Sequence, residues 1–129
     1  MKQKKRIGRW LMRLVPKWLL EKWYESKALR LYERKVEEAE IYRHRNNVRV
    51  FVVTAGMNNL ALVTRNGWRE AKRQGLVDKY DLNEIRRMCV YCTATVNESE
   101  VMSKKEMIGK RKAFVRWYVG NMMKDEEMP

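Results

Sequence analysis

The sequence predicts a mainly α-helical fold built as a single small domain. The chain has 129 residues with only two prolines and six glycines, so few residues interrupt regular elements. A chain of this length is typical of one domain and buries about two-thirds of its unfolded surface, which is enough for a core without cross-links. We expect a basic arm and amphipathic helix over residues 1–15 and a helical domain over residues 16–129.

The first expected element is a short amphipathic helix after the basic arm. Trp10 and Trp18 lie on its apolar side, whereas Arg9 and Arg13 fall on the opposite side. Pro16 interrupts this helix, because proline disfavours the helical conformation in the residue before it. Proline also fits the first turn of a helix, so a new helix is expected to begin there.

The next helix is expected near residues 17–45 and is the longest in the chain. At about 100° per residue its apolar side chains gather on one side, and Arg30 falls on the far side. The apolar band is wide and includes Lys35, so it predicts packing on a domain core rather than a coiled-coil seam. Asn46 and Asn47 favour a boundary at the end of this helix.

The longest run without a charged residue extends from Val50 to Thr64 and is expected at the centre of the fold. Its β-branched and aromatic residues favour strands, and Gly56 to Asn59 suits a turn, so a short β-hairpin over residues 48–64 is one interpretation. The other elements are helical, and a buried helix would show the same apolar composition. We therefore expect a helix here, with the hairpin as the alternative, and a core that holds the flanking basic segments apart.

Three further helices complete the expected order. A short one is expected over residues 67–74, and one over residues 81–93 opens with an Asp-x-x-Glu capping box. The last helix ends near residue 123. Both Asn97 and Ser103 qualify as its N-cap, because each is followed by a glutamate three residues later.

The net charge of +13 is concentrated in two terminal blocks. Residues 1–24 carry eight Lys or Arg against one Glu, and residues 104–124 carry seven against one, which gives +7 and +6. Such blocks are typical of proteins that bind a polyanion: nucleic acid, an anionic membrane or an acidic protein surface. The residues expected to contact phosphate or acidic protein are Lys2, Lys4, Lys5, Arg6, Arg9, Arg13, Lys110, Arg111, Lys112 and Arg116. Trp10 and Trp18 lie among them and are candidates for stacking on bases.

The sequence favours a non-enzymatic, basic structural or assembly protein of a nucleoprotein particle, such as a phage virion. Nucleic acid and neighbouring protein subunits are its expected partners. The alternative is a peripheral membrane protein anchored by its cationic amino-terminal helix, in which Trp10 and Trp18 contact lipid. A third interpretation is a helix-turn-helix DNA-binding regulator, in which Asn83, Arg86 and Arg87 face the DNA groove.

The sequence gives only weak signals for secretion or for insertion into a membrane. Arg9 and Arg13 interrupt the apolar residues near the amino terminus, and no small-residue cleavage site follows them. The run from Val50 to Thr64 is too short to span about 30 Å of hydrocarbon as a helix. We therefore expect a protein that is not secreted and that resides in the cytoplasm or within a virion or nucleoprotein particle.

Enzymatic chemistry is not expected. His44 is the only histidine, and no phosphate-binding loop, dinucleotide fingerprint or nucleophile motif occurs. Cys89 and Cys92 are too close in the chain to cross-link a domain, so a reducing compartment is expected. Zinc usually takes four ligands, which one histidine and two cysteines do not supply. We expect the cysteines to be small core residues on one helical face, with no metal, cofactor or small-molecule substrate.

Overall fold

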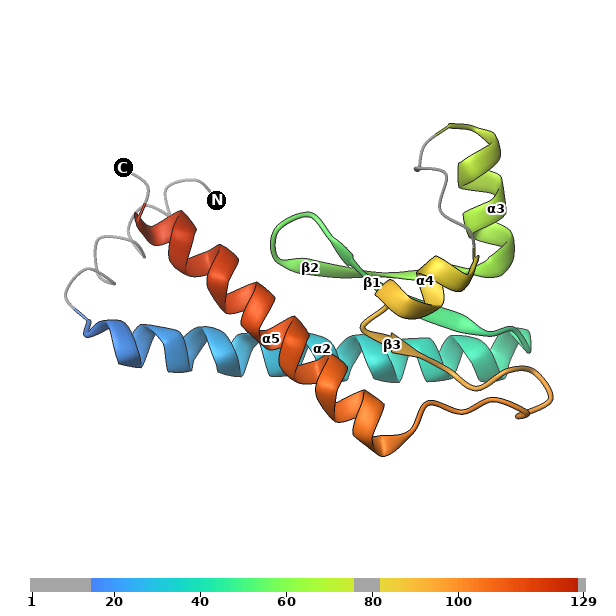
Figure 1. Cartoon of the computed structure of the whole chain (residues 1–129), viewed down its shortest axis with the longest axis horizontal. Helices are drawn as coiled ribbons and strands as arrows, with labels where there is room; N and C mark the ends of the chain where they lie inside the picture. The colour runs from blue at the N-terminus through green and yellow to red at the C-terminus, as the bar shows by residue number, and fades with distance from the viewer. Residues whose placement is uncertain (1–14, 76–81, 128–129) are drawn as a thin grey trace.

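The computed structural model describes residues 15–75 and 82–127, which form two long helices, two short helices and a small antiparallel sheet (Figure 1). The helices are α2 (Lys17–Asn46), α3 (Arg65–Arg73), α4 (Leu82–Met88) and α5 (Lys104–Glu127), and the strands are β1 (Val50–Ala55), β2 (Asn59–Thr64) and β3 (Tyr91–Cys92). The mainly α-helical prediction is confirmed, although the sheet has three strands rather than two. The arm and helix expected over residues 1–15 lie, except for Val15, outside the described residues.

The long helix expected near residues 17–45 is confirmed as α2. It begins directly after Pro16 and ends one residue beyond the expected end. Asn47 adopts the left-handed conformation, with φ 52°, and its backbone N–H donates to the carbonyl of Arg43, which closes the last turn. The buried face follows a spacing of about one helical turn and consists of Leu20, Tyr24, Ala28, Tyr32 and Ala39.

The segment from Val50 to Thr64 is a β-hairpin, so the helix expected there is wrong and the alternative is confirmed. β1 and β2 pair antiparallel, from Val50 opposite Thr64 to Ala55 opposite Asn59. Gly56 in the connecting turn has φ +64°, a conformation that residues with a side chain rarely adopt. This turn contacts α5, where Asn121 donates to the backbone carbonyl of the turn residue Met57 at 2.8 Å.

The ambiguity of this run has a physical cause in the burial of β1. Val50, Phe51 and Val52 are all buried, although consecutive side chains of a strand point to opposite faces. Both α2 and α4 pack against β1. A strand covered on both faces has a continuous apolar sequence instead of an alternating one, and its pattern resembles that of a buried helix.

The helix expected over residues 81–93 is shorter than predicted, because the chain after α4 joins the free edge of β1. The backbone N–H of Val90 donates to the carbonyl of Val52 at 2.8 Å, and the next two residues form β3. The resulting strand order is β2-β1-β3. The expectation that Cys89 and Cys92 share one helical face is therefore wrong: Cys89 follows α4, and Cys92 lies in β3.

The two remaining helices begin at clear N-caps. The side chain of Thr64 accepts a hydrogen bond from the backbone N–H of Gly67 at 3.1 Å, so α3 starts slightly earlier than expected. The hydroxyl of Ser103 accepts from the backbone N–H of Glu106 at 3.1 Å. Of the two starts considered for the last helix, the one at Ser103 is therefore confirmed and the one at Asn97 is wrong.

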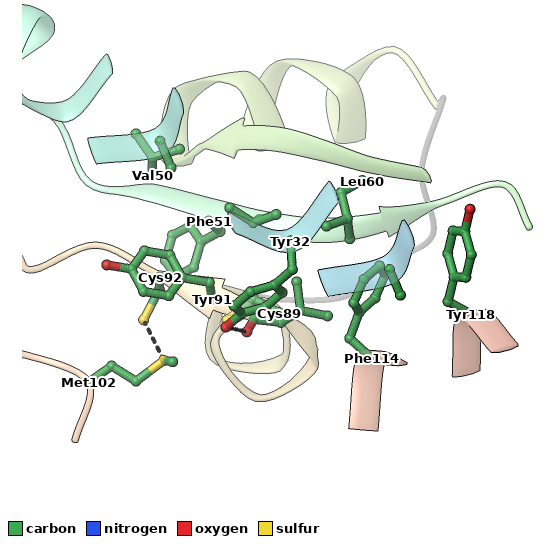
Figure 2. Close-up of a cluster of buried hydrophobic side chains, with 14 of the residues drawn as sticks. Tyr32, Val50, Phe51, Leu60, Cys89, Tyr91, Cys92, Met102, Phe114 and Tyr118 are labelled. Carbon is green, nitrogen blue, oxygen red and sulfur yellow. Dashed lines mark hydrogen bonds between the residues drawn. The ribbon is translucent and has the colours of Figure 1, made fainter. Parts of the chain in front are cut away.

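The core lies where α2, α5 and the sheet meet (Figure 2). The ring centroids of Tyr32 in α2 and Phe114 in α5 are 5.9 Å apart, and Phe114 lies 6.0 Å from Tyr118. The hydroxyl of the buried Tyr32 donates to the carbonyl of Val90 at 2.9 Å, so its polar end is satisfied. The packing of α5 across α2 positions the side chains that line the groove between these two helices.

Candidate functional site

An open groove of about 670 Å³ lies between the amino-terminal half of α2 and α5, the two helices that cross in Figure 1. Lys17, Glu21 and Glu25 line the groove from α2, at intervals of four residues that place them on one helix face. Apolar side chains from both helices also line it, among them Leu29 and Val119. The groove therefore combines an apolar surface with charged side chains.

The α5 wall of this groove is cationic. Arg111, Lys112 and Arg116 line it, and both Lys112 and Arg116 are exposed to solvent. Over the described ranges 15–75 and 82–127, none of these three side chains takes part in an ion pair. No carboxylate of the described segments neutralises them by direct contact, so they are open to an external anion.

The groove brings together cations from both basic blocks of the sequence. Lys17 belongs to the block over residues 1–24, and the three cations of the α5 wall belong to the block over residues 104–124. The expectation that the core holds these blocks apart is therefore wrong for these residues, because α2 and α5 pack directly against each other. The hydroxyl of Tyr24 also joins the two helices by donating to Glu126 at 2.7 Å.

Among the described members of the predicted polyanion-contact set, Lys110 is the one that binds another part of the protein. Its Nζ donates to the backbone carbonyls of Arg87 at 2.8 Å and of Cys89 at 2.7 Å, at the carboxy-terminal end of α4. Carbonyls at the end of a helix lack intrahelical partners, so a lysine there provides them with a hydrogen-bond donor. Its positive charge also interacts favourably with the negative end of the helix dipole. Lys110 therefore fastens α4 to α5 and does not line the cationic groove.

Several predicted contact residues lie outside the described part of the chain: Lys2, Lys4, Lys5, Arg6, Arg9, Trp10 and Arg13. Trp18 is described and is 65% exposed at the start of α2. Of the residues expected to face DNA, Arg87 is exposed, Arg86 is engaged by carboxylates, and the side chain of Asn83 is outside the description. The helix-turn-helix interpretation stays a prediction. In the described segments no helix has the length and apolar character needed to span a membrane.

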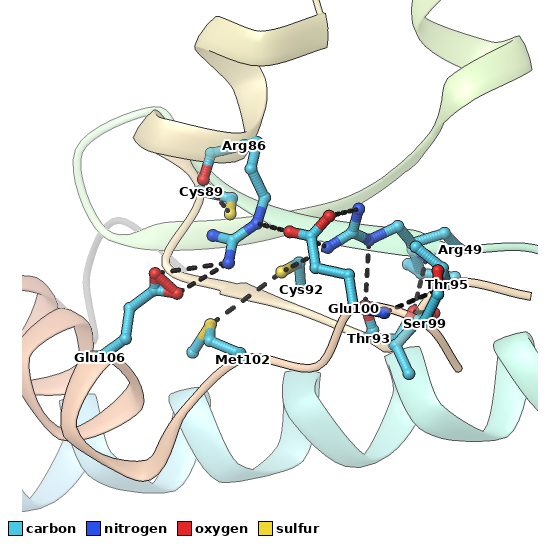
Figure 3. A network of polar contacts seen from close by, with 12 residues as sticks. Arg49, Arg86, Cys89, Cys92, Thr93, Thr95, Ser99, Glu100, Met102 and Glu106 are labelled. Carbon is cyan, nitrogen blue, oxygen red and sulfur yellow. Dashed lines mark hydrogen bonds and ion pairs between the residues drawn. The ribbon is translucent and has the colours of Figure 1, made fainter. Parts of the chain in front are cut away.

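A second cluster of polar side chains lies beside β3 (Figure 3). Glu100 binds Arg49 through two nitrogens, at 3.1 and 3.4 Å, and binds Nε of Arg86 at 3.0 Å. Arg86 also binds Glu106 at 2.7 Å. Bidentate contacts between a guanidinium and a carboxylate are strong and directional. This network therefore fixes the connection between β3 and α5 against β1 and α4.

The two cysteines adjoin this network. Arg49 Nη2 donates to Cys92 Sγ at 3.5 Å, and the Cys89 thiol donates to the carbonyl of Arg86 at 3.2 Å. The neighbouring Cys89 thiol, together with the charges of Arg86 and Arg49, lowers the pKa of Cys92, whereas the neighbouring Cys92 and burial raise the pKa of Cys89. Both residues are almost fully buried, so neither thiol is presented to a large substrate.

Sequence reasoning missed the role of Arg49, Glu100 and Glu106. Arg49 and Glu100 are 51 residues apart in the chain, and their contact depends on the pairing of β3 with β1. No local pattern marks such a pair. Glu106 was visible only as part of a capping box, which does not reveal its second contact with Arg86.

No protein-family model matches the chain, and neither a curated protein nor a solved structure is significantly similar to it. Within the described segments, no group of three or more His, Cys, Asp or Glu side chains is placed to hold a metal ion. The groove between α2 and α5, with its cationic α5 wall, is the feature that best supports a function.

Proposed function

We propose that this chain is a non-enzymatic, basic structural or assembly protein that binds the phosphate backbone of nucleic acid within a larger cytoplasmic or virion particle. The cationic wall of the α2–α5 groove carries this proposal, because Arg111, Lys112 and Arg116 share one opening and have no ion-pair partner among the described residues. Phosphate contacts of this kind give affinity without reading bases. Binding is therefore expected to be insensitive to nucleotide sequence and sensitive to salt.

The acidic side chains of α2 restrict where a polyanion lies in the groove. Glu21 and Glu25 repel phosphate from the α2 wall, so the backbone is expected to follow the rim formed by α5. Lys112 and Arg116 are four residues apart, which corresponds to about 6 Å along a helix. Two neighbouring contacts of this spacing suit one continuous strand of phosphates.

The test compares two double variants of the same helix. Lys112→Gln with Arg116→Gln removes two groove charges, whereas Lys104→Gln with Lys105→Gln removes two exposed charges that do not line the groove. Binding to a labelled DNA duplex is measured by fluorescence anisotropy at low salt. The groove variant is expected to bind at least about tenfold more weakly than the control variant. An equal loss in both variants would assign the affinity to net charge and not to the groove.

A second candidate function, peripheral membrane binding, is favoured by exposed apolar side chains at the start of α2. Trp18 is 65% exposed, Leu19 45% and Trp23 38%. The ammonium of Lys27 lies 4.0 Å from the ring centre of Trp23, so cationic and aromatic groups share this surface. Such a combination suits the interface of an anionic bilayer.

Co-sedimentation with anionic phospholipid vesicles tests this second candidate. Trp18→Ala with Leu19→Ala is expected to reduce vesicle binding, because both side chains would enter the interface. Ile41→Ala is the control, since Ile41 is 45% exposed near the other end of α2. If wild type does not bind vesicles, or if both variants bind equally, the membrane candidate is rejected.

A further inference from the structure

The helix α3 is well defined but contributes little to the core (Figure 1). None of its nine residues is buried, and it packs on β2. Its ends are nevertheless fixed: Thr64 caps its start, and Gly75, with φ +72°, follows shortly after its last residue. A helix of this length is marginal in water without tertiary contacts. Core packing therefore does not account for the exposed side of α3.

The exposed side of α3 is cationic. Three exposed cations lie at positions i, i+4 and i+7, within about 60° on one helix face: Arg65, Arg69 and Lys72. We call these three residues the α3 stripe. Over residues 15–75 and 82–127, none of them forms an ion pair. The single acid of α3, Glu70, is bound by Arg73 and Gln74 instead.

The α3 stripe opposes the stability of its own helix. Arg65 lies in the first turn, which contains no acidic residue, and the positive end of the helix dipole disfavours a cation there. Arg69 follows four residues later, so the two like charges repel each other. Residues that break such local rules without helping the fold are typical of functional sites. An anion bound against the α3 stripe would offset both unfavourable interactions.

The α3 stripe is separate from the α2–α5 groove. Figure 1 places α3 towards one end of the long axis, whereas the amino-terminal half of α2 and the carboxy-terminal half of α5 extend towards the other end. Leu29 is the last residue of α2 that lines the groove, and Tyr42 lines a pocket together with Trp68 of α3. Leu29 and Tyr42 are 13 positions apart, which corresponds to about 20 Å of helix. One chain therefore presents two separate cationic surfaces.

We propose that the α3 stripe binds the phosphate backbone of a second nucleic-acid duplex, so that one chain bridges two duplexes. Guanidinium groups suit this partner, because each can form two parallel hydrogen bonds to one phosphate. Arg65 and Arg69 are about 6 Å apart along the helix, the same spacing as that of Lys112 and Arg116 in the groove. The bridging rests on the proposed function, since the first duplex lies in the groove. A basic protein that joins duplexes in this way would pack nucleic acid within a particle.

The experiment mixes the full-length chain with a DNA duplex in two labelled forms, one with a donor dye and one with an acceptor dye, at low salt and with duplex in excess. Wild type is expected to bring the two dyes together and to give energy transfer. Arg65→Gln with Arg69→Gln is expected to reduce this transfer at least about tenfold, although one duplex still binds through the groove. Lys104→Gln with Lys105→Gln removes the same charge outside both surfaces and should keep the wild-type transfer.

If the first α3 variant does not fold by circular dichroism, Arg69→Gln with Lys72→Gln decides the question in its place. Equal transfer by the α3 variant and the control variant overturns the α3 stripe as a second site. Absence of transfer with a wild type that binds the duplex overturns bridging, because one duplex then occupies both surfaces or α3 binds none.

The groove variant separates this failure from a failure of the proposed function. If Lys112→Gln with Arg116→Gln binds a single duplex as tightly as the control variant does, the groove is not the binding site. That result does not depend on the α3 variant, whose loss of transfer reports on the α3 stripe alone.

Discussion

The hydroxyl of Tyr24 in α2 donates a hydrogen bond of 2.7 Å to the carboxylate of Glu126 near the end of α5. This bond joins residues that are 102 positions apart and connects the two helices that form the cationic groove. Burial, and then the contact with Glu126, raises the pKa of Tyr24, so the hydroxyl keeps its proton at neutral pH. The groove walls are therefore joined by a hydrogen bond whose donor is a neutral hydroxyl.

Tyr24→Phe is expected to lower the free energy of unfolding by about 1–2 kcal/mol, because it leaves the ring in the core and removes only the bond to Glu126. The measurement is equilibrium unfolding in urea. Tyr42→Phe is the control, since Tyr42 is 44% exposed, and its free energy of unfolding should match wild type. Equal stability of all three proteins would show that the bond between α2 and α5 contributes nothing.

Removal of Glu100 is expected to loosen the connection between β3 and α5. Glu100→Ala leaves the side chains of Arg49 and Arg86, both mostly buried, without this shared partner. The expected loss in free energy of unfolding is about 1 kcal/mol, because Glu100 itself is half exposed and solvent screens its contacts. Glu38→Ala breaks a surface pair with Lys35 and should have a smaller effect in the same urea experiment. A larger effect at Glu38 would contradict this ranking.

Two glycine-to-alanine substitutions should change the stability of the protein in opposite directions. Gly56→Ala is expected to destabilise the protein by about 1 kcal/mol, because φ at Gly56 is +64° although no atom crowds the position. Gly109→Ala is expected to stabilise it by about 0.8 kcal/mol, since Gly109 lies inside α5 with open space at the site of the added carbon. Thermal unfolding measures both. A stabilising Gly56→Ala would mean that the hairpin turn is formed differently.

Stability should decline at alkaline pH through the buried tyrosines. Burial raises the pKa of Tyr32 to about 12 from its ordinary value of 10.0. Because the folded state holds this proton more tightly, the resulting stability is complete below pH 10.0 and is lost as the pH rises towards 12. Urea unfolding across this range should show a shallower decline for Tyr32→Phe than for wild type. If the stability of both proteins falls equally with pH, groups other than Tyr32 cause the loss of stability at alkaline pH.

The helices of this fold follow largely from local sequence. Pro16 and Asn47 bound α2, and Ser103 begins α5, each by a mechanism that a few neighbouring residues determine. The sheet was less predictable, because β1 is covered on both faces and therefore lacks the alternation that marks a half-buried strand. β3 has only two residues, and pairing with β1 is what defines it.

The candidate groove was predictable in part. The basic block of α5 is visible in the sequence and includes Arg111, Lys112 and Arg116, but the spacing of charges did not distinguish Lys110, which binds the end of α4 instead. The placement of Lys17 in the same groove depends on the crossing of α2 and α5. Contacts of that range follow from packing and have no local signal.

The measurement that tests the central claim most directly is the salt dependence of DNA binding. Each phosphate contact on a duplex adds about 0.9 to the slope of the logarithm of the binding constant against the logarithm of salt concentration. Lys112→Gln with Arg116→Gln removes two groove contacts, so the slope should become shallower than that of wild type by about 1.8. The variant at Lys104 and Lys105 should retain the wild-type slope. A slope unchanged by the groove substitutions would contradict phosphate binding at this site.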